Sequence, residues 1–184
     1  MSEHTRYDRV AMGLHWLMAL AIIGLMVAGF IMTGLKPGSA QQFQMYQMHK
    51  SVGATVLVLT LLRLFWRLGH RPPPLPDHMP EWEKLLAHAG HLGLYALMLA
   101  MPLAGWAVVS TSPYNIPTVL YGLIPVPHLP LPRGFNDGAK LLHEAGAWMM
   151  ILAVLGHVGA ALRHHFLIKD DVLIRMLPRF RRSP

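Results

Sequence analysis

Residues 10–35 read VAMGLHWLMALAIIGLMVAGFIMTGL and contain no Asp, Glu, Lys or Arg. A helix needs about 20 mainly apolar residues to cross the hydrocarbon core of a bilayer, and this segment exceeds that length. It lacks the short apolar core and small-residue cleavage site of a secretory signal, and further apolar segments follow it. The segment therefore predicts a membrane-spanning helix that stays in the mature protein.

Further apolar segments extend this pattern along the chain. The second reaches spanning length if Lys50, Arg63 and Arg67 extend their charged ends to the two membrane surfaces. The third lies in a long uncharged stretch, where Pro102 predicts a kink. The predicted spans are residues 10–34, 45–68, 85–109 and 140–163. They predict an all-α integral membrane protein: one domain over residues 1–184, built as a bundle of four transmembrane helices.

Composition narrows the chemistry that such a bundle can support. The chain has 53% hydrophobic and 14% charged residues, 12 His and no Cys, whereas a soluble domain has about 25% charged residues. Without Cys there are no disulfides, iron–sulfur clusters, thiolate metal sites or covalent CxxCH haem. No Walker or other Gly-rich phosphate-binding motif occurs, and the GxSxG motif of serine hydrolases is absent from the sequence. A redox cofactor must therefore bind to nitrogen, oxygen or thioether ligands, and the excess of His points to imidazole nitrogen.

The distribution of Lys and Arg predicts the orientation, because cytoplasmic loops of membrane proteins are enriched in both. The side with both termini has twelve Lys and Arg residues: Arg6, Arg9, Arg63, Arg67, Arg71, Lys84, Arg163, Lys169, Arg175, Arg179, Arg181 and Arg182. The opposite side has four: Lys36, Lys50, Arg133 and Lys140. Both termini are therefore predicted to be cytoplasmic. The net charge of +7 then reflects topology and contact with anionic membrane lipid, with no folded basic domain for nucleic acid.

Four histidines match in predicted depth. His15 and His157 each lie six residues inside the Arg that ends their span, and His49 and His143 begin their spans on the outer side. The 14 residues between His143 and His157 bring them to within about 40° of one helix face and about 21 Å apart along it. This arrangement predicts two pairs, His15 with His157 near the cytoplasm and His49 with His143 near the outer surface.

Two His–His pairs stacked across a bilayer suit two b-type haems with two axial imidazoles each. Glycines next to the ligands, such as Gly53 and Gly156, would leave room for a porphyrin. A single interior His could instead hydrogen-bond across the bundle. Zinc requires ligands that converge at one point, which two separate levels do not provide. A non-redox His-rich transporter is the remaining alternative.

Long motifs of this sequence resemble the prokaryotic cytochrome b561 family. They are RVAMGLHWLMAL, MHKSVGATVLVLTLLRLFWRL, LLAHAGHLGLYALMLAMPLAGW, KLLHEAGAWMMILAVLGHVGAALRHHF and KDDVLIRMLPR. The resemblance covers nearly the whole chain. It implies a multi-pass, di-haem cytochrome of the bacterial inner membrane, and the family's axial ligands fall on His15, His49, His143 and His157.

The resemblance also implies a reaction. Members with similar motifs are superoxide:ubiquinone oxidoreductases, which implies oxidation of superoxide to O2 at the periplasmic side and reduction of ubiquinone. Relatives with the same ligands serve as haem b subunits that link a dehydrogenase or hydrogenase-type partner protein to quinone, and this is the alternative. Lys50, Lys140 and Arg133 lie on the outer side, where they would attract an anion or merely anchor the chain at the interface.

Reduction of quinone also requires a proton source beside an apolar slot. The HxxH motif of His88 and His91 enters the third span from the cytoplasmic side, and His164 and His165 reach the same level from the fourth. We predict that these four histidines form the quinone and proton site. The alternative is that they contact haem propionates or lie at the membrane interface.

Overall fold

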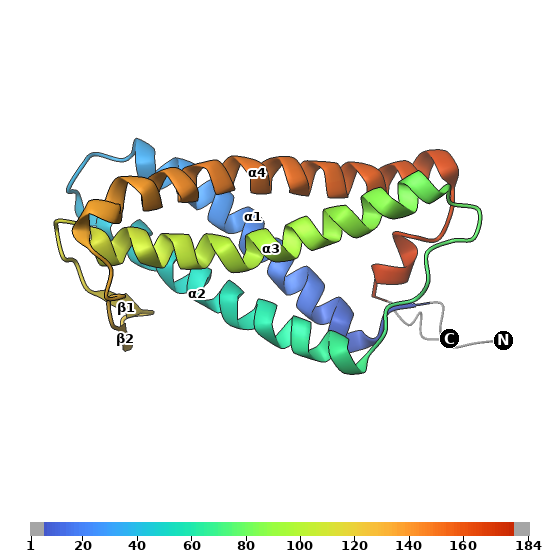
Figure 1. Ribbon diagram of the computed structural model, residues 1–184, viewed down its shortest axis with the longest axis horizontal. Helices are drawn as coiled ribbons and strands as arrows, with labels where there is room; N and C mark the ends of the chain where they lie inside the picture. The colour runs from blue at the N-terminus through green and yellow to red at the C-terminus, as the bar shows by residue number, and fades with distance from the viewer. Residues whose placement is uncertain (1–5, 179–184) are drawn as a thin grey trace, which may run out of the picture.

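The computed structural model describes residues 6–178, and its main feature is four long helices (Figure 1). Each is long and apolar enough to cross a membrane, which confirms the predicted four-helix architecture. The helices are α1 (Arg9–Gly34), α2 (Ala40–Gly69), α3 (Glu81–Thr111) and α4 (Asn136–Arg163). Arg179, Arg181 and Arg182, which were counted on the side of the termini, lie outside the described residues.

The helices extend beyond the predicted spans because polar residues and caps lie outside the hydropathy signal. The side chain of Ser39 accepts a hydrogen bond from the backbone N–H of Gln42 and caps α2, which satisfies an otherwise unpaired helical donor. Pro80 precedes α3, consistent with the fixed backbone angle that suits proline to a helix start. The α3 helix is continuous across Pro102.

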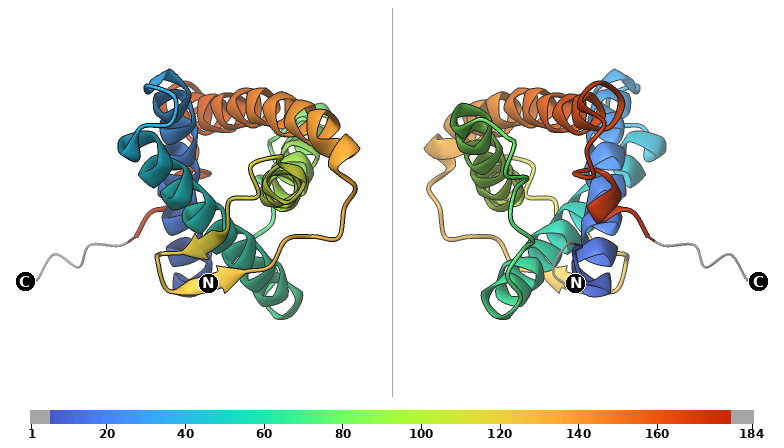
Figure 2. Two further views of the ribbon diagram at one scale, coloured as in Figure 1. Left: turned by 90° about the vertical axis from the view of Figure 1, so that its left-hand side faces the viewer. Right: turned by 90° about the vertical axis from the view of Figure 1, so that its right-hand side faces the viewer.

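The long segment between α3 and α4 holds a β-hairpin, which we did not predict. Strand β1 (Thr118–Leu120) pairs antiparallel with β2 (Ile124–Val126). Three residues connect the last pair, Leu120 and Ile124, and the first two of them, Tyr121 and Gly122, have positive φ, 52° and 73°. The hairpin packs on α2, where the N–H of Tyr121 donates to Ser51 Oγ at 3.0 Å. We call this end of the bundle the hairpin end (Figure 2).

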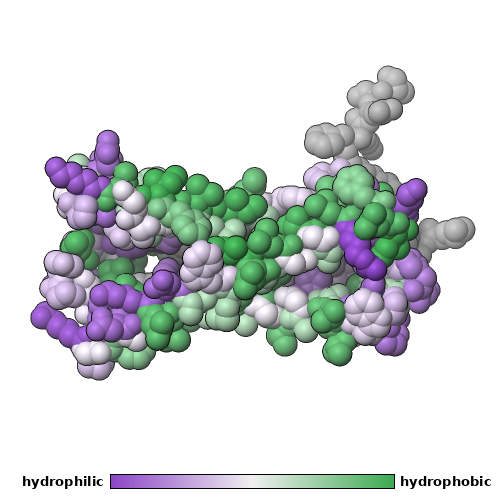
Figure 3. All heavy atoms as spheres, turned by 90° about the horizontal axis from the view of Figure 1, so that it is seen from above, coloured by the Kyte–Doolittle hydropathy of each residue, from purple (hydrophilic) through white to green (hydrophobic). Residues whose placement is uncertain are grey.

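Few side chains are buried in the core, and apolar side chains dominate the outside. Met18, Met98 and Met150 form the central cluster, consistent with the adaptable packing of methionine. Large apolar side chains such as Phe65 and Leu152 are exposed. Figure 3 shows hydrophobic residues over the middle of the visible face and hydrophilic residues gathered toward its two ends, as expected of a bundle whose sides face lipid.

The opposite end of the bundle carries the first described residues, the α2–α3 linker and the segment after α4, and we call it the tail end (Figure 1). After α4 the chain forms a π-helical turn, η3 (His164–Ile168), and a 3-10 turn, η4 (Ile174–Met176). The segment folds back onto α1, where Trp16 Nε1 donates to the carbonyl of Met176 at 2.9 Å. The terminal segment is thereby fixed beneath the helices.

Candidate functional site

The hairpin end of the bundle brings His49 of α2 and His143 of α4 together. Their ring centroids are 6.3 Å apart and their planes are inclined by 75°. His143 Nδ1 donates to the carbonyl of Met101 at 3.2 Å, which leaves Nε2 as the free nitrogen of that ring. Nδ1 of His49 is buried without a hydrogen-bond partner. The predicted outer pair is therefore present as two facing imidazoles.

The tail end holds the second pair, His15 of α1 and His157 of α4. Their ring centroids are 6.1 Å apart with an interplanar angle of 60°. Arg63 of α2 lies beside this pair, with Nη2 3.4 Å from His15 Nδ1. That distance is beyond the usual range of a hydrogen bond, so the contact does not fix the tautomer of His15. The two pairs together come from three helices, α1, α2 and α4, and α4 contributes one histidine to each pair.

The separation of each pair agrees with ligation of one metal by both rings. An imidazole nitrogen binds a metal at about 2 Å and lies about 1 Å from its ring centroid, so two opposed axial rings place their centroids about 6 Å apart. The observed 6.1 and 6.3 Å match this value. Ordinary packing of two rings does not require this same separation at two levels of one bundle. The residues present therefore fit a bis-imidazole haem at each level.

Small residues beside the outer pair support the same assignment. A Cβ added to Gly105 of α3 would lie 3.1 Å from Cε1 of His143, and one added to Gly29 of α1 would lie 3.9 Å from Cε1 of His49. Gly53, four residues after His49, and Gly156, next to His157 of the tail-end pair, have no neighbouring atom within 4 Å of an added Cβ. Gly146 differs, because Met101 packs against the space that its side chain would fill. Gly146 thus serves the packing of α3 on α4.

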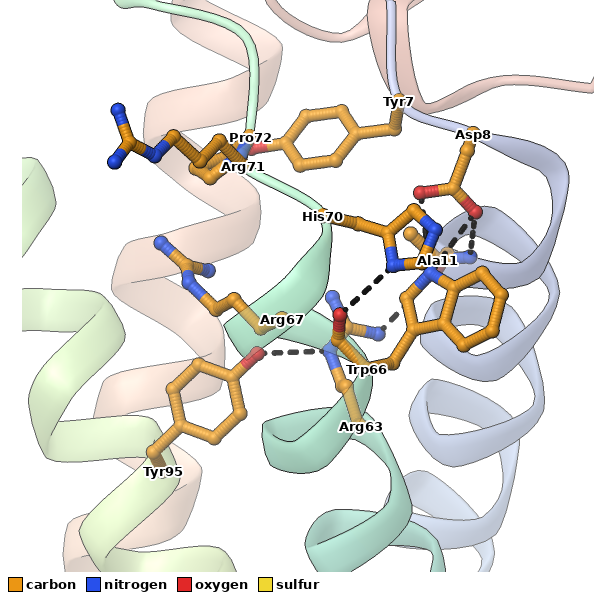
Figure 4. A pocket seen from close by; sticks show the side chains of 10 residues that line it. All are labelled: Tyr7, Asp8, Ala11, Arg63, Trp66, Arg67, His70, Arg71, Pro72 and Tyr95. Carbon is orange, nitrogen blue, oxygen red and sulfur yellow. Dashed lines mark hydrogen bonds between the residues drawn. The ribbon is translucent and has the colours of Figure 1, made fainter.

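A cavity of about 30 Å³ lies at the tail end, between the start of α1 and the ends of α2 and α3 (Figure 4). Arg63 Nε donates to Tyr95 Oη at 2.9 Å, and the Arg67 guanidinium lies 5.8 Å from the Tyr95 ring centroid. The cavity has room for a water molecule and is too small for a quinone. Arg63, which lies beside His15, and Arg67 and Arg71, which also line the cavity, carry guanidinium groups that are suited to pairing with carboxylates, such as those of a haem.

The four histidines predicted as a quinone site have different surroundings. His91 lies beside the tail-end pair, with its ring centroid 5.4 Å from that of His157. His88 is exposed on α3. His164 is buried among carboxylates, and His165 stacks edge-on against Phe166. Their assignment to quinone stays a prediction.

Sequence reasoning did not single out several polar residues at this end. Arg63 was interpreted only as a charge reaching the membrane surface, whereas the structure places it at His15. Glu83 and Asp170 both contact His164, although they lie on either side of it by 81 and 6 positions in the sequence. One signal in the sequence could have identified Arg63: it lies inside an otherwise apolar span, and charged residues in such positions usually face the bundle interior.

Within residues 6–178, no group of three or more His, Asp or Glu side chains has the geometry of a metal site. A zinc centre built from protein ligands alone is therefore not formed by the described residues. Paired imidazoles are a different arrangement, because a haem supplies four further ligands from its own ring.

Comparison with known proteins gives a match over nearly the whole chain. A family model described as prokaryotic cytochrome b561 matches residues 6–179. The chain is 34% identical to "Cytochrome b561 homolog 2" of Escherichia coli (strain K12), over 94% of this chain and 91% of that protein. It is 32% identical to "Probable superoxide oxidase CybB" of Yersinia pestis, over 97% of this chain and 99% of that protein.

A further relative carries a different name. "Probable Ni/Fe-hydrogenase 1 B-type cytochrome subunit" of Escherichia coli (strain K12) is 25% identical, over 91% of this chain and 86% of that protein. All of these relatives are cytochromes or oxidases by name, and the family is one of membrane electron-transfer proteins that bind haem b. With its four apolar helices and a family match from residue 6 to residue 179, this chain belongs to the prokaryotic cytochrome b561 family.

Proposed function

We propose that this protein transfers electrons across the membrane between superoxide and the ubiquinone pool. The observation that supports it best is the two imidazole pairs, with centroid separations of 6.1 and 6.3 Å, at opposite ends of one bundle. Two b-type haems, held by His15 with His157 and by His49 with His143, would supply one-electron transfer at each level. The relative named a probable superoxide oxidase, which this chain matches over 97% of its length, supports superoxide as the donor.

In the proposed orientation, the tail end faces the cytoplasm and the hairpin end faces the periplasm. The excess of Lys and Arg on the tail side supports this orientation. Superoxide is then oxidised to O2 at the hairpin end and ubiquinone is reduced near the tail end. His143 is held by its hydrogen bond to the Met101 carbonyl, and such a bond fixes the ring orientation and the tautomer of a ligating imidazole.

The test uses the purified protein with its haems, a superoxide generator and a soluble ubiquinone analogue. We expect superoxide to reduce the haems, seen in the visible spectrum, and the quinone to reoxidise them, with two superoxide ions consumed per quinol formed. The absence of a Soret band would contradict the haem assignment. Haems that superoxide leaves oxidised would contradict the proposed donor.

A second candidate is a haem b subunit that passes electrons between quinone and a dehydrogenase or hydrogenase-type partner. The 25% identity to a protein named a hydrogenase cytochrome subunit is the observation that favours it. In that case, superoxide would not reduce the haems of the isolated protein at a useful rate. A separate redox protein that copurifies with the chain and reduces its haems would support this candidate.

Basic residues at the hairpin end lead to a prediction about the rate. Lys140 is 3.6 Å from Asp137 in an exposed pair, with 58% of the Lys140 side chain accessible, and Lys50 directly follows His49. Positive charge at the mouth of a site raises the encounter rate with an anion by about 10-fold or more at low salt. Reversal of both charges, Lys50→Glu with Lys140→Glu, should therefore slow superoxide consumption by about 10-fold and flatten its salt dependence.

The measurement is the rate of haem reduction by superoxide as ionic strength is varied. Lys84→Glu, at the tail end, is the matched control and should leave both the rate and its salt dependence unchanged. Equal rates in the double variant and the wild type at low salt would show that these lysines serve only as interfacial anchors.

A further inference from the structure

Four titratable side chains form a continuous chain of contacts at the tail end. His78 Nε2 is 3.4 Å from Asp170 Oδ2, and the same oxygen is 2.6 Å from His164 Nδ1. On the other side of its ring, His164 Nε2 is 3.7 Å from Glu83 Oε2. The residues come from the α2–α3 linker, the turn after η3, η3 itself and the first turn of α3. Folding therefore brings these four side chains together from distant positions in the sequence.

The chain of contacts runs from water into the protein. The side chain of His78 is 59% exposed, whereas those of Asp170, His164 and Glu83 are 6%, 9% and 10% exposed. His78 also lines a cleft of about 480 Å³ with Pro74, Asp77 and Asp171, which is large enough for many water molecules. Only the first side chain is thus largely exposed, and the other three are mostly covered by the protein.

The buried end lies below the tail-end imidazole pair. His164 follows His157 by seven residues, and the backbone at His164 keeps right-handed helical angles. Seven residues are close to two full turns, so His164 lies near the same face of α4, about 10 Å further along the axis. On α3, Glu83 precedes His91 by eight residues. The chain of contacts therefore ends about two turns from the residues proposed to hold the tail-end haem.

We propose that His78, Asp170, His164 and Glu83 form a proton relay that carries protons from the water at the tail end into the bundle for quinone reduction. This inference rests on the proposed function. Reduction of one quinone by two superoxide ions takes up two protons and yields two O2 and one quinol. No other oxidant or reductant is needed, and both protons must come from water through the protein.

Each contact of the relay has a definite proton step. In the resting protein His164 Nδ1–H donates to Oδ2 of Asp170. Once His164 has exchanged to the tautomer with its proton on Nε2, a proton held on His78 Nε2 passes to Oδ2 of Asp170 and on to the free Nδ1 of His164, while Nε2 releases its proton toward Glu83 and the resting tautomer is restored. The 3.4 Å between His78 and Asp170 and the 3.7 Å between His164 Nε2 and Glu83 exceed the usual hydrogen-bond range, so both steps need a small side-chain rotation or one bridging water. Imidazole suits this role, since it exchanges protons near neutral pH and has two nitrogens.

Neighbouring charges hold the relay in place. Arg163 Nη1 donates to Glu83 Oε1 at 3.0 Å, and Arg175 pairs with Asp171 at 2.8 Å beside the cleft. Burial acts to raise the pKa of Asp170, but hydrogen bonds from His164 and from the N–H of Val172 outweigh it and hold the pKa below the ordinary 3.8. Asp170 is therefore ionised at neutral pH and attracts protons toward both histidines.

The lowered pKa of Asp170 keeps its carboxylate charged over the pH range of the test. A carboxylate with a lowered pKa contributes stability above its unfolded pKa, and that stability is lost as the pH falls through the lowered folded value. The contribution of Asp170 is therefore lost only as the pH falls below about 3.8. A change in turnover between pH 6 and pH 8 does not come from the titration of Asp170.

The experiment compares quinol formation by the haem-loaded protein in wild type and in Asp170→Asn and Glu83→Gln. We expect about 10-fold slower turnover at pH 8, where protons are scarce, a smaller loss at pH 6, and an increased solvent deuterium isotope effect. Haem content and the rate of haem reduction by superoxide should stay as in the wild type. Imidazole added to the buffer should restore turnover, because it carries protons past the broken relay.

Two further variants make the test decisive. Glu81→Gln is the matched control, since Glu81 forms an exposed pair with Lys84 two positions before Glu83, and it should behave as the wild type. His78→Gln alters an exposed side chain, so it tests the relay even if Asp170→Asn does not fold. As a readout without turnover, labelled-histidine NMR of the resting protein should show that Asp170→Asn changes the ring chemical shifts of His78 and His164 together, because both rings contact Asp170.

The outcomes distinguish the relay from the function on which it rests. If wild type takes no electrons from superoxide, the proposed function is wrong and the relay falls with it. If wild type reduces quinone while His78→Gln and Glu83→Gln keep its rate, pH profile and isotope effect, the relay alone is overturned. A uniform loss of thermal stability with an unchanged pH profile and no rescue by imidazole would also overturn it.

Discussion

His143→Ala is expected to remove one low-spin haem and leave the other in place. His143 and His49 face each other across 6.3 Å, whereas the His15–His157 pair lies 14 residues away along α4, which corresponds to about 21 Å. Loss of one axial imidazole should therefore affect only its own level. Electron transfer from superoxide to quinone should be lost, because the remaining haem cannot bridge the membrane alone.

Double variants test the pairing directly, because residues that act as one unit are not additive. His49→Ala with His143→Ala changes one pair, and we expect it to lose no more haem than either single variant. His143→Ala with His157→Ala changes both pairs and should lose both haems. The measurement is the ratio of haem to protein, together with the low-spin visible spectrum.

His128→Ala serves as the matched control. His128 lies in the segment between β2 and α4 and contacts the carbonyl of Ile116 through Nε2 at 3.3 Å, so its loss should leave both haems. The pairing would be wrong if His49→Ala with His143→Ala lost both haems. It would also be wrong if His143→Ala with His157→Ala kept one.

Prediction from sequence succeeded where the signal is local in the chain. Long, mainly apolar segments predicted four helices, because each spanning helix must place about 20 apolar residues in lipid. The charged residues at the ends of the spans also indicated how deep each histidine lies in the membrane. These depths predicted the pairs His15 with His157 and His49 with His143, and the structure brings these rings together. Helix periodicity and membrane thickness are strict enough to relate distant residues.

The hairpin between α3 and α4 shows where the local signal fails. Its strands have three residues each, and Pro125 lies within the second, which argues against a strand unless it lies at an edge. Tyr121 occupies a turn position with positive φ, where glycine or asparagine is usual. Contacts with Ser51 and Thr55 of α2 stabilise the turn, and such contacts are visible only in three dimensions.

The chain of contacts through His164 could not be predicted for a related reason. His78, Glu83 and Asp170 were not singled out from the sequence, since charged residues near span ends usually face water. The fold back of the segment after α4 buries Asp170 against His164. Hydropathy gives depth along a helix, but it does not give the path of a terminal segment beneath the bundle.

Gly105→Val is expected to displace the His143 ring and so release the haem at the hairpin end while the other haem stays bound. A Cβ at Gly105 would lie 3.1 Å from Cε1 and 3.4 Å from Nδ1 of His143. The ring cannot move freely, because its Nδ1 donates to the carbonyl of Met101 on the same helix as Gly105. The γ-methyl groups of valine extend the overlap well beyond the single carbon of alanine.

The series Gly105→Ala and Gly105→Val should therefore give a graded response. Alanine requires a shift of a few tenths of an ångström, so we expect both haems with an altered spectrum or potential for one of them. Valine should halve the ratio of haem to protein. Gly93→Val on the same helix is the control, since no atom lies within 4 Å of an added Cβ there. Full haem content in Gly105→Val would show that His143 does not hold a haem in this orientation. Loss at both levels would show that Gly105 supports the packing of the whole bundle, whereas loss of one haem assigns to Gly105 the space in which His143 is fixed as a ligand.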